Sequence, residues 1–561
     1  MGRIALMLVA GVTLAAVARA QVTERIDVAA DGSELPAGVA GPALAMTPDA
    51  RFVAFVAQGA VGAGVTRGTH VWVRDRSTGL LSIADVDSDG VVADGAAGSG
   101  LGGLALSADG RFVAFTSAAT NLVATDANVC GTSAVVGSCP DAFLHDRLTA
   151  ATVLVSVASG GTQGNAATTG PVALSANGHV VAFTSSATNL VAGDTNGKPD
   201  VFVRDLDAGT TRRVSVRSDG GQGHGTPVGP LALSADGRFV LFGYTDDDLA
   251  PGTGTGTLYL HDRQLGTTTH VGYASAGFAL SADGTRVAFA SADATLVAGD
   301  TNGLPDVFLR DLARQTTVRV DVAGDGSQAL GGNPTFAPLV ALSSDGRFAA
   351  FTSDATNLVT GDTNGTPDVF VHDTQTGTTV RVDVASDGTQ AVGGSPGAVA
   401  VSADGTCVAF VSDAPNLVPC DTNGRADVFV HCAGGTPPPA PAGCPAGPPT
   451  LASLGAEVSA LAALVAQVPP GGLATALQRI LGRASAAVAA ADRAQAKRRR
   501  ARAALTTALQ ALATLRARLA TRRAARLIGA EVRTQLEAAV DQARADAKKL
   551  RATFTAAGSG A

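Results

Sequence analysis

The nine residues SADGRFVAF, at positions 107 to 115, recur in close variants seven times along this 561-residue chain. The seven copies begin at residues 47, 107, 175, 234, 281, 343 and 402. The copies are 47 to 68 residues apart, which is enough for one small antiparallel sheet but too short for an independent hydrophobic core. We therefore expect seven similar sheets that bury their faces against one another in a ring.

Each unit also contains a second phrase, which reads DVFVRD at residues 200 to 205 and is rich in β-branched and aromatic residues. An apolar run precedes SADG, and in the first six units a further strand follows DVFVRD, as in TTVRVDV from Thr378. Four strands per unit are therefore predicted. Both faces of RFVAF are apolar, as expected for sheets that are covered on both sides.

The two ends of the repeat region indicate how the ring closes. The seventh unit stops at His431 and Cys432 without a fourth strand, whereas TERIDVAADG from Thr23 matches TVRVDVASDG from Thr379. We expect residues 22 to 29 to complete the last sheet, so that no edge stays open. The predicted fold is an all-β seven-bladed β-propeller over residues 21 to 432.

The phrase SADGRFVAF resembles the WD40-like (PD40) repeat of the TolB-type propeller family, and the resemblance covers residues 21 to 432. It implies a secreted bacterial propeller and is specific for the fold. It implies almost nothing about function, because one fold serves many functions.

The N-terminus and the cysteines indicate export. Residues 1 to 20 contain Arg3, an apolar run from Ile4 to Val17 and a small-residue cleavage site before Gln21, which is typical of a signal peptide. No stretch is apolar enough for a transmembrane segment. The expected location is the periplasm or the extracellular medium, where six cysteines can form disulfides in 15 connectivities. The favoured pairs are Cys130 with Cys139, Cys407 with Cys432, and Cys420 with Cys444.

Beyond the repeats the composition changes. Residues 433 to 450 form a Pro-rich linker, and residues 451 to 561 are rich in Ala, Leu and Arg, with apolar residues at helical spacing. Helices are predicted at about 473 to 493, 495 to 520 and 528 to 553, after a helix that Pro469-Pro470-Gly471-Gly472 ends. This small α-helical bundle is similar to the short helical domain at the C-termini of many secreted bacterial proteins.

Charge divides along the same boundary. Residues 451 to 561 contain 18 Lys or Arg and 6 Asp or Glu, a net charge of +12, and the whole chain has −7, which leaves −19 for residues 1 to 450. The basic run from Lys497 to Arg500 could bind an anionic polymer of the cell envelope or the propeller itself. The alternative is a solvated helix face. Nucleic acid is not an expected partner, because the protein is exported and no aromatic residues alternate with the basic ones.

One recurring group of polar residues could bind a metal ion. In four units DTNG is followed by a further Asp. The four sets are Asp194, Asn196 and Asp200; Asp300, Asn302 and Asp306; Asp362, Asn364 and Asp368; and Asp421, Asn423 and Asp427. The second unit keeps Asp126 and Asn128, but an insertion is expected to displace Asp141, and the first and fourth units lack the pattern.

Oxygen ligands at positions 1, 3 and 7 resemble the first part of a calcium loop, so calcium is the predicted cofactor. The pattern departs at position 12, where Asp205 would lie about 16 Å beyond Asp200 along an extended strand. In the alternative interpretation Asp-x-Asn-Gly is turn chemistry, in which side-chain oxygens accept hydrogen bonds from backbone N–H groups.

An enzyme would need catalytic groups, and the innermost strands, which should line the channel, contain only small apolar residues such as VALS. Most histidines fall on strand positions of the template, and His224, in a Gly-rich loop, is the one candidate for chemistry. The sequence therefore favours a secreted, non-enzymatic binding or scaffold protein whose partner is an unknown protein or an anionic envelope polymer. The alternative is an exported metal-dependent hydrolase or lyase with its site on the loop face.

Overall fold

The computed structural model describes most of residues 21–434, and beyond them residues 472–493 and 498–521 with scattered neighbouring positions. Within the first part the exceptions are residues 29–37, 59–67, 96, 98–102, 131–138, 247, 251–256, 275–276, 331–332, 334–335, 395, 420 and 422. The predicted signal peptide, residues 435 to 450 of the predicted linker and the proposed Cys420–Cys444 pair lie outside the described residues.

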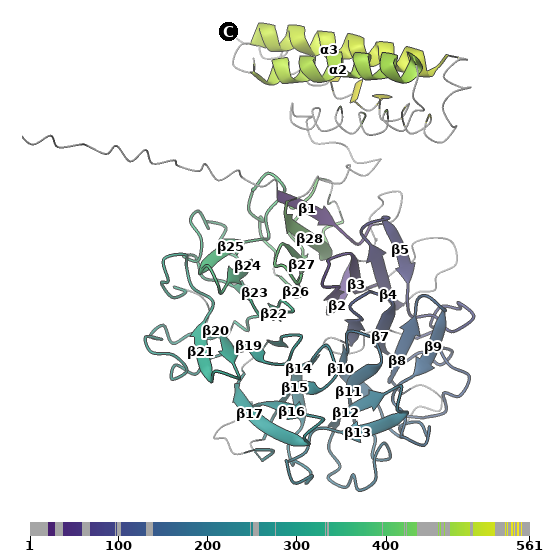
Figure 1. Cartoon of the computed structure of the whole chain (residues 1–561), viewed down its shortest axis with the longest axis vertical. Coiled ribbons are helices and arrows are strands. Elements are labelled where there is room, and N and C mark those ends of the chain that lie inside the picture. The colour runs from purple at the N-terminus through teal and green to yellow at the C-terminus, as the bar shows by residue number, and fades with distance from the viewer. Residues whose placement is uncertain are drawn as a thin grey trace, which may run out of the picture. The chain divides into compact units, whose positions relative to one another are not determined.

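Seven four-stranded antiparallel sheets form a ring (Figure 1), so the predicted seven-bladed β-propeller is confirmed. Blades 1 to 3 are β2 (Val39–Met46), β3 (Phe52–Gln58), β4 (Thr69–Asp75) and β5 (Leu80–Ile83); β6 (Leu104–Leu106), β7 (Phe112–Ser117), β8 (Asp141–Asp146) and β9 (Ala151–Leu154); and β10 (Thr168–Leu174), β11 (Val180–Ser185), β12 (Asp200–Asp205) and β13 (Thr210–Arg213).

Blades 4 to 6 are β14 (Pro227–Leu233), β15 (Phe239–Tyr244), β16 (Thr257–Asp262) and β17 (Thr267–Tyr273); β18 (Phe278–Leu280), β19 (Arg286–Ser291), β20 (Asp306–Asp311) and β21 (Thr316–Arg319); and β22 (Val340–Leu342), β23 (Phe348–Ser353), β24 (Asp368–Asp373) and β25 (Thr378–Arg381). Blade 7 combines β26 (Val399–Val401), β27 (Cys407–Ser412) and β28 (Asp427–Ala433) with the N-terminal strand β1 (Gln21–Arg25).

The ring closes between its two chain ends. Strand β1 pairs with β28 in antiparallel register, from Gln21 opposite Ala433 to Arg25 opposite Phe429. The pairing places the N-terminal segment at the outer edge of blade 7, where the sequence left a missing fourth strand. Every blade therefore has four strands.

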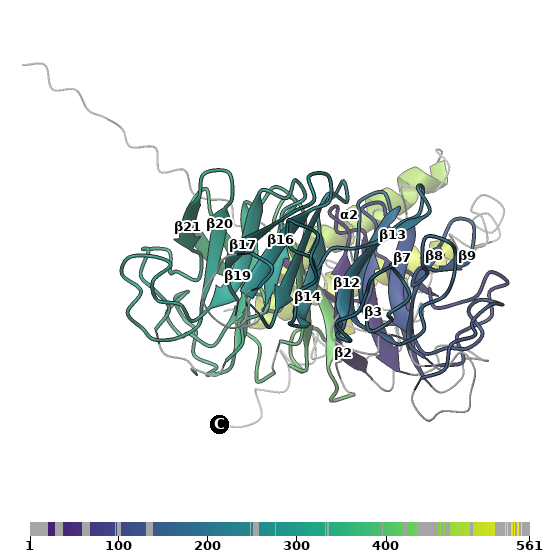
Figure 2. The same ribbon diagram turned by 90° about the horizontal axis from the view of Figure 1, so that it is seen from below.

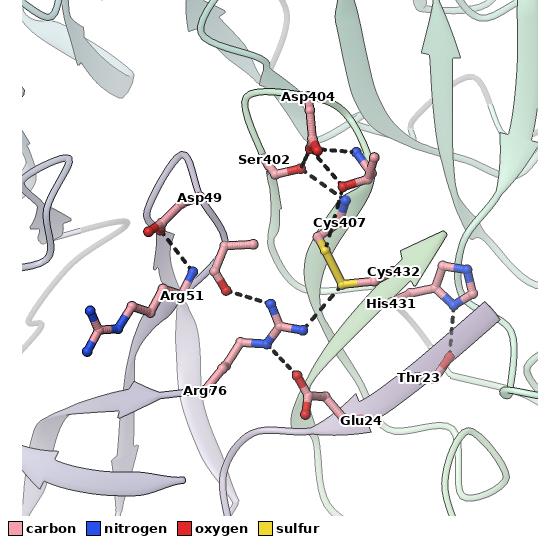
Figure 3. Close-up of a disulfide and its surroundings, with 12 residues drawn as sticks. Thr23, Glu24, Asp49, Arg51, Arg76, Ser402, Asp404, Cys407, His431 and Cys432 are labelled. Carbon is pink, nitrogen blue, oxygen red and sulfur yellow. Dashed lines mark hydrogen bonds and ion pairs between the residues drawn. A yellow bond between two sulfur atoms is a disulfide. The ribbon is translucent and has the colours of Figure 1, made fainter. Parts of the chain in front are cut away.

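A disulfide and an arginine lie at this closure (Figure 3). Cys407 and Cys432 face each other on β27 and β28 and form one of the expected disulfides. Arg76 of blade 1 bonds to Glu24 on β1 and to the Sγ atom of Cys432, 3.3 Å away. One blade-1 side chain therefore contacts both the closing strand and its partner strand.

The SADG phrase forms a tight turn that also joins neighbouring blades. In blade 2, Ser107 donates its hydroxyl to Asp109, and Asp109 accepts the backbone N–H of Arg111. Gly110 has a φ of 70°, and a Cβ atom there would lie 2.3 Å from Phe52 of blade 1. Glycine is required at this position both for its backbone conformation and for the close approach of the preceding blade.

The same turns are linked by backbone hydrogen bonds from blade to blade. The N–H of Ala108 donates to Ala176, Ala176 donates to Ala235, and Ala235 donates to Ala282, at 2.7 to 2.9 Å. Ala282 donates to Ser344 at 2.8 Å, and Ala403 of blade 7 donates to Pro48 of blade 1 at the same distance. These bonds fix the positions of the blades around the axis.

The side view of the ring shows its two ends (Figure 2), which differ in their side chains. The SADG turns and the short turns between third and fourth strands share one end, which we name the turn end. Arginine–aspartate pairs such as Arg111–Asp146 and Arg347–Asp373 connect the two kinds of turn there. The loops between second and third strands and the connections between blades share the other end, which we name the loop end.

The C-terminal part is a separate compact unit, and the chain divides between Gly443 and Cys444. Helices α2 (Gly472–Arg493) and α3 (Arg498–Leu519) pack through a common hydrophobic core that contains Leu477, Leu481, Leu512 and Leu515. No helix among the described residues is both long and apolar enough to cross a membrane.

Candidate functional site

The four DTNG loops lie at the loop end, in blades 3, 5, 6 and 7. Within each loop the carboxylates of the first and the last Asp come close together. In blade 5, the Asn302 amide donates to the carboxylate of Asp306 at 2.9 Å. The equivalent bonds are 2.7 Å from Asn364 to Asp368 and 3.1 Å from Asn423 to Asp427. The amide of Asn196 instead donates to the backbone carbonyl of Gly223 at 3.1 Å. In these bonds the Asn side chain acts as a donor.

An arginine from the fourth strand lies against both carboxylates of each DTNG loop. Its Nη atoms lie 3.2 to 3.6 Å from the first Asp, and between 2.5 and 3.5 Å from the last Asp. The four arginines are Arg213, Arg319, Arg381 and Arg25, with 5 to 12% of their side-chain surface exposed. A guanidinium therefore supplies positive charge where the sequence pattern predicted calcium.

This arrangement bears on the calcium prediction without deciding it. Among the residues that the structure describes, no group of three or more His, Cys, Asp or Glu side chains is arranged to hold a metal ion. The Asn oxygens follow the turn interpretation, since Asn302 accepts the N–H of Leu304 and Asn196 that of Lys198, both at 3.0 Å. Calcium at the twelve DTNG residues stays a prediction.

A glutamine that the sequence motifs did not reveal connects the DTNG loop to the next blade. Gln328 accepts from Arg319 at 2.9 Å and donates to the Thr301 hydroxyl of the DTNG loop at 2.9 Å. Its backbone carbonyl accepts the Asn357 amide of blade 6 at 2.9 Å. Gln163, Gln222 and Gln390 follow the fourth strands of blades 2, 3 and 6 in the same way. The recurrence of Gln after that strand, and of the sequence TNL or PNL in the next unit, is the signal that could have revealed this network.

Blades 5 to 7 add a second buried carboxyl beside the last Asp of the DTNG pattern. Asp321, Asp383 and Asp27 occupy these places on the chain that follows the fourth strand or, in blade 7, follows β1. Burial, and then the neighbouring carboxylate, raise the pKa of Asp321 and of Asp383 well above the usual range. The same causes raise the pKa of Asp427, beside Asp27, to about 9. In blade 3 a serine takes this place, and Ser215 donates to Asp200 at 2.6 Å.

Blade 2 corrects one expectation. Its insertion does not displace Asp141, because the Asn128 amide still donates to the Asp141 carboxylate at 2.8 Å. The expected Cys130–Cys139 disulfide is present and closes the base of the insertion, so the chain returns to the template position.

No arginine lies beside the carboxylates of this blade among its described residues. Leu154 stands in the corresponding register position, and the Gln163 amide donates to both Asp126 and Asp141 at 2.8 and 2.9 Å. Burial raises the pKa of Asp141 to about 6.

Blade 4 differs from the template, and its Asp248 pairs with an exposed histidine in the connection from blade 3. His224 lies with Nδ1 2.6 Å from Asp248, and its side chain is 77% exposed. Arg217 is 3.8 Å from the same carboxylate. The histidines at strand positions, such as His145 and His261, are instead buried and bonded to threonine hydroxyls.

The inner strands place no ionisable side chain among their described residues. Leu106, Leu233, Leu280, Leu342 and Val401 are partly exposed there. An apolar wall offers no acid or base for catalysis.

These features define a seven-bladed β-propeller with a hydrogen-bonded loop end. No family model matches the chain, and no curated protein matches it. Solved structures with similar folds include an oligogalacturonate lyase of Vibrio parahaemolyticus (12% identity, 73% of this chain and 97% of that chain, TM-score 0.41) and the β-propeller domain of the trilobed protease of Pyrococcus furiosus (9%, 67% and 90%, 0.39).

A putative TolB of Agrobacterium tumefaciens is also similar (15% identity, 54% of this chain and 88% of that chain, TM-score 0.30). At such identities the likeness is one of fold. Because the fold occurs in enzymes and in other proteins, it favours neither a binding protein nor an enzyme.

Proposed function

We propose that the protein is an exported, non-enzymatic binding or scaffold protein whose loop end recognises a partner protein or an anionic polymer of the cell envelope. The observation that carries this proposal is a set of five exposed positions. They make the same backbone hydrogen bond to the next blade but differ in side chain. At each position the backbone N–H donates to an Asn or Asp side chain of the next blade, at 2.7 to 2.9 Å. The positions are Asp94, Asn165, His224, Leu330 and Val392.

The contrast between constant frame and variable side chain supports recognition. A rigid frame that presents varied side chains on neighbouring loops is where binding usually resides. The five positions are spread over successive blades, so a partner of extended shape could contact several of them.

Blade 3 places three basic side chains close together at this end, with Asp219 and Asp248 within 3.5 and 3.8 Å of Arg217. Lys198, Arg217 and His224 lie in adjoining loops that Asn196 connects, since it accepts the N–H of Lys198 and donates to the carbonyl of Gly223. Asp248 pairs with both Arg217 and His224 and holds them together. An anionic group on the partner would be attracted to this basic cluster.

The test changes the five side chains and leaves their backbone bonds intact. Serine at all five positions should abolish co-sedimentation with peptidoglycan or retention on an immobilised anionic envelope glycan. It should lower the melting temperature only through the lost side-chain bonds of Asp94, Asn165 and His224 to the next blade. The matched control places serine at Leu148 and Leu265, which are 74% and 68% exposed on turns at the turn end. Equal binding by the loop-end variant and the parent would contradict the proposal.

A second candidate function, an exported metal-dependent hydrolase or lyase, has one observation in its favour. The Asp248 carboxylate holds Nδ1 of His224, which leaves Nε2 of an exposed imidazole to act as a general base. Replacement of His224 by alanine should abolish any metal-dependent cleavage of an envelope polysaccharide. Cleavage that persists in this variant would remove the histidine from the mechanism.

A further inference from the structure

A cavity at the loop end lies between blades 5 and 6, and two buried carboxyls line it. Its volume is about 20 Å³, and its lining includes Asp306, Asp321, Thr352, Ser353 and Asp354. A space of this size has room for one occupant as large as a water molecule. Thr352 and Ser353 end strand β23, so the walls come from both blades.

One oxygen in this cavity lacks a partner. Asp321 is 3% exposed, and its Oδ1 atom has no hydrogen-bond partner in the described part of the chain. A buried carboxylate oxygen without a donor or a cation costs free energy. The lining position and the unpartnered oxygen therefore both indicate a missing occupant.

The charges around the cavity indicate what that occupant is. Arg319 pairs with Asp300 and Asp306, at 3.6 and 3.2 Å, and Asp321 lies beside Asp306. Three carboxylates and one guanidinium leave two negative charges, which one divalent cation would neutralise. Calcium accepts carboxylates together with neutral oxygens and water, in flexible geometry.

We propose that Asp306 and Asp321 bind one divalent cation of the calcium type in this cavity, with neutral oxygen ligands from blade 6. The site differs from the predicted DTNG loop site, because Asp321 belongs to the segment after the fourth strand and the cation does not need Asn302. Its occupant joins blade 5 to blade 6 at the loop end. It is independent of the proposed binding function.

Blade 3 supplies the variant for the test. Asp321→Ser copies the natural arrangement in which Ser215 donates to Asp200, so it removes a cation ligand and satisfies the remaining carboxylate. The acid pairs of blades 6 and 7 stay in place in parent and variant. The difference between the two proteins therefore isolates blade 5.

The experiment titrates the mature protein with calcium in a calorimeter and follows thermal unfolding with calcium or with chelator. We expect the Asp321→Ser variant to bind one calcium ion fewer than the parent and to lose that part of the calcium-dependent rise in melting temperature. In chelator it should melt no lower than the parent, because a repulsive carboxyl pair has been removed. Ser215→Ala, the control, should bind as many ions as the parent.

Asp321→Asn keeps the size of the side chain and serves if the serine variant does not fold; it should also lose one ion. Two results would overturn the proposal. One is a parent protein that binds no calcium at millimolar concentration. The other is an unchanged number of bound ions in a folded Asp321 variant.

Discussion

The pKa values of aspartates are shifted in opposite directions at the two ends of the ring. At the turn end, hydrogen bonds from Arg111 and Arg347 hold the pKa of Asp146 and of Asp373 far below the usual range. At the loop end, burial raises the pKa of Asp141 to about 6. The turn-end carboxylates therefore stabilise the fold above their unfolded pKa and lose that contribution as the pH falls, whereas a carboxyl with a raised pKa loses its contribution as the pH rises.

This difference shows that the formal charge does not by itself predict the electrostatic field around this propeller. The sequence assigns −19 to residues 1 to 450, but the loop-end carboxyls are paired with arginine or favour the protonated form. The negative charge that these carboxyls contribute is therefore smaller than the formal count suggests. This leaves the basic cluster of blade 3 less opposed at the loop end than the sequence suggested.

The largest expected effect comes from removing the strand that supplies blade 7 with its loop-end charges. Deletion of residues 21 to 27 removes β1 together with Arg25 and Asp27, leaves the edge of β28 unpaired, and removes the guanidinium from Asp421 and Asp427. We expect the ring to lose several kcal/mol, since a buried charge without its partner alone costs about 3–5 kcal/mol. Thermal unfolding and size-exclusion chromatography would measure it.

Gln21→Ala, at an exposed position on the same strand, is the control and should melt like the parent. A deletion variant that melts with the control and stays monomeric would show that closure of the ring does not depend on β1.

The next effect compares the same kind of ion pair at the two ends. Arg319→Leu, which copies Leu154 of blade 2, leaves buried carboxylates without a cation and should cost about 3 kcal/mol. Arg347→Leu breaks a pair whose arginine is 36% exposed and should cost far less, because solvent screens it. Urea unfolding in chelator at neutral pH measures the loss of unfolding free energy in both variants. Equal losses would contradict the proposed electrostatic difference between the loop end and the turn end.

The sequence could predict the blades because each phrase encodes a local structure. SADG encodes a turn through Ser107, Asp109 and Gly110, and the apolar residues after it are the central strand of the sheet. The number of copies was therefore the number of blades. No partner from another unit was needed for this conclusion.

The partners of the candidate site could not be predicted in the same way. The Arg319 guanidinium approaches Asp300 from the fourth strand, and Asn357 reaches Gln328 from the next blade. A calcium loop and an arginine-paired loop have the same local sequence, so spacing alone could not separate them. Likewise, only the fold shows that the Cys130–Cys139 disulfide returns Asp141 to its place.

An effect of at most similar size should appear as acid sensitivity near the turn end. His261 is buried and bonded through Nδ1 to the Thr268 hydroxyl at 2.9 Å, and burial lowers its pKa to about 4. Its neutral form is favoured in the folded state, so stability is lost as the pH falls from about 6.5 to about 4, by up to about 3 kcal/mol.

His261→Gln keeps a donor for Thr268 and does not titrate, so its unfolding free energy should fall less than that of the parent over this range. Urea unfolding at a series of pH values measures the difference. Parallel curves for the two proteins would show that His261 does not cause the acid sensitivity.

The smallest expected effect tests whether the turn-end aspartates act through charge or through hydrogen bonding. Asp109 accepts from the Ser107 hydroxyl at 2.6 Å and from the backbone N–H of Arg111 at 3.0 Å. Asn177 occupies the same place in blade 3 and accepts the equivalent bonds at 2.7 and 3.1 Å. Asp109→Asn should therefore be close to neutral, whereas Asp109→Ala, which loses both acceptors, should cost about 1 kcal/mol. If urea unfolding shows equal losses for the two variants, the charge of Asp109 stabilises the turn.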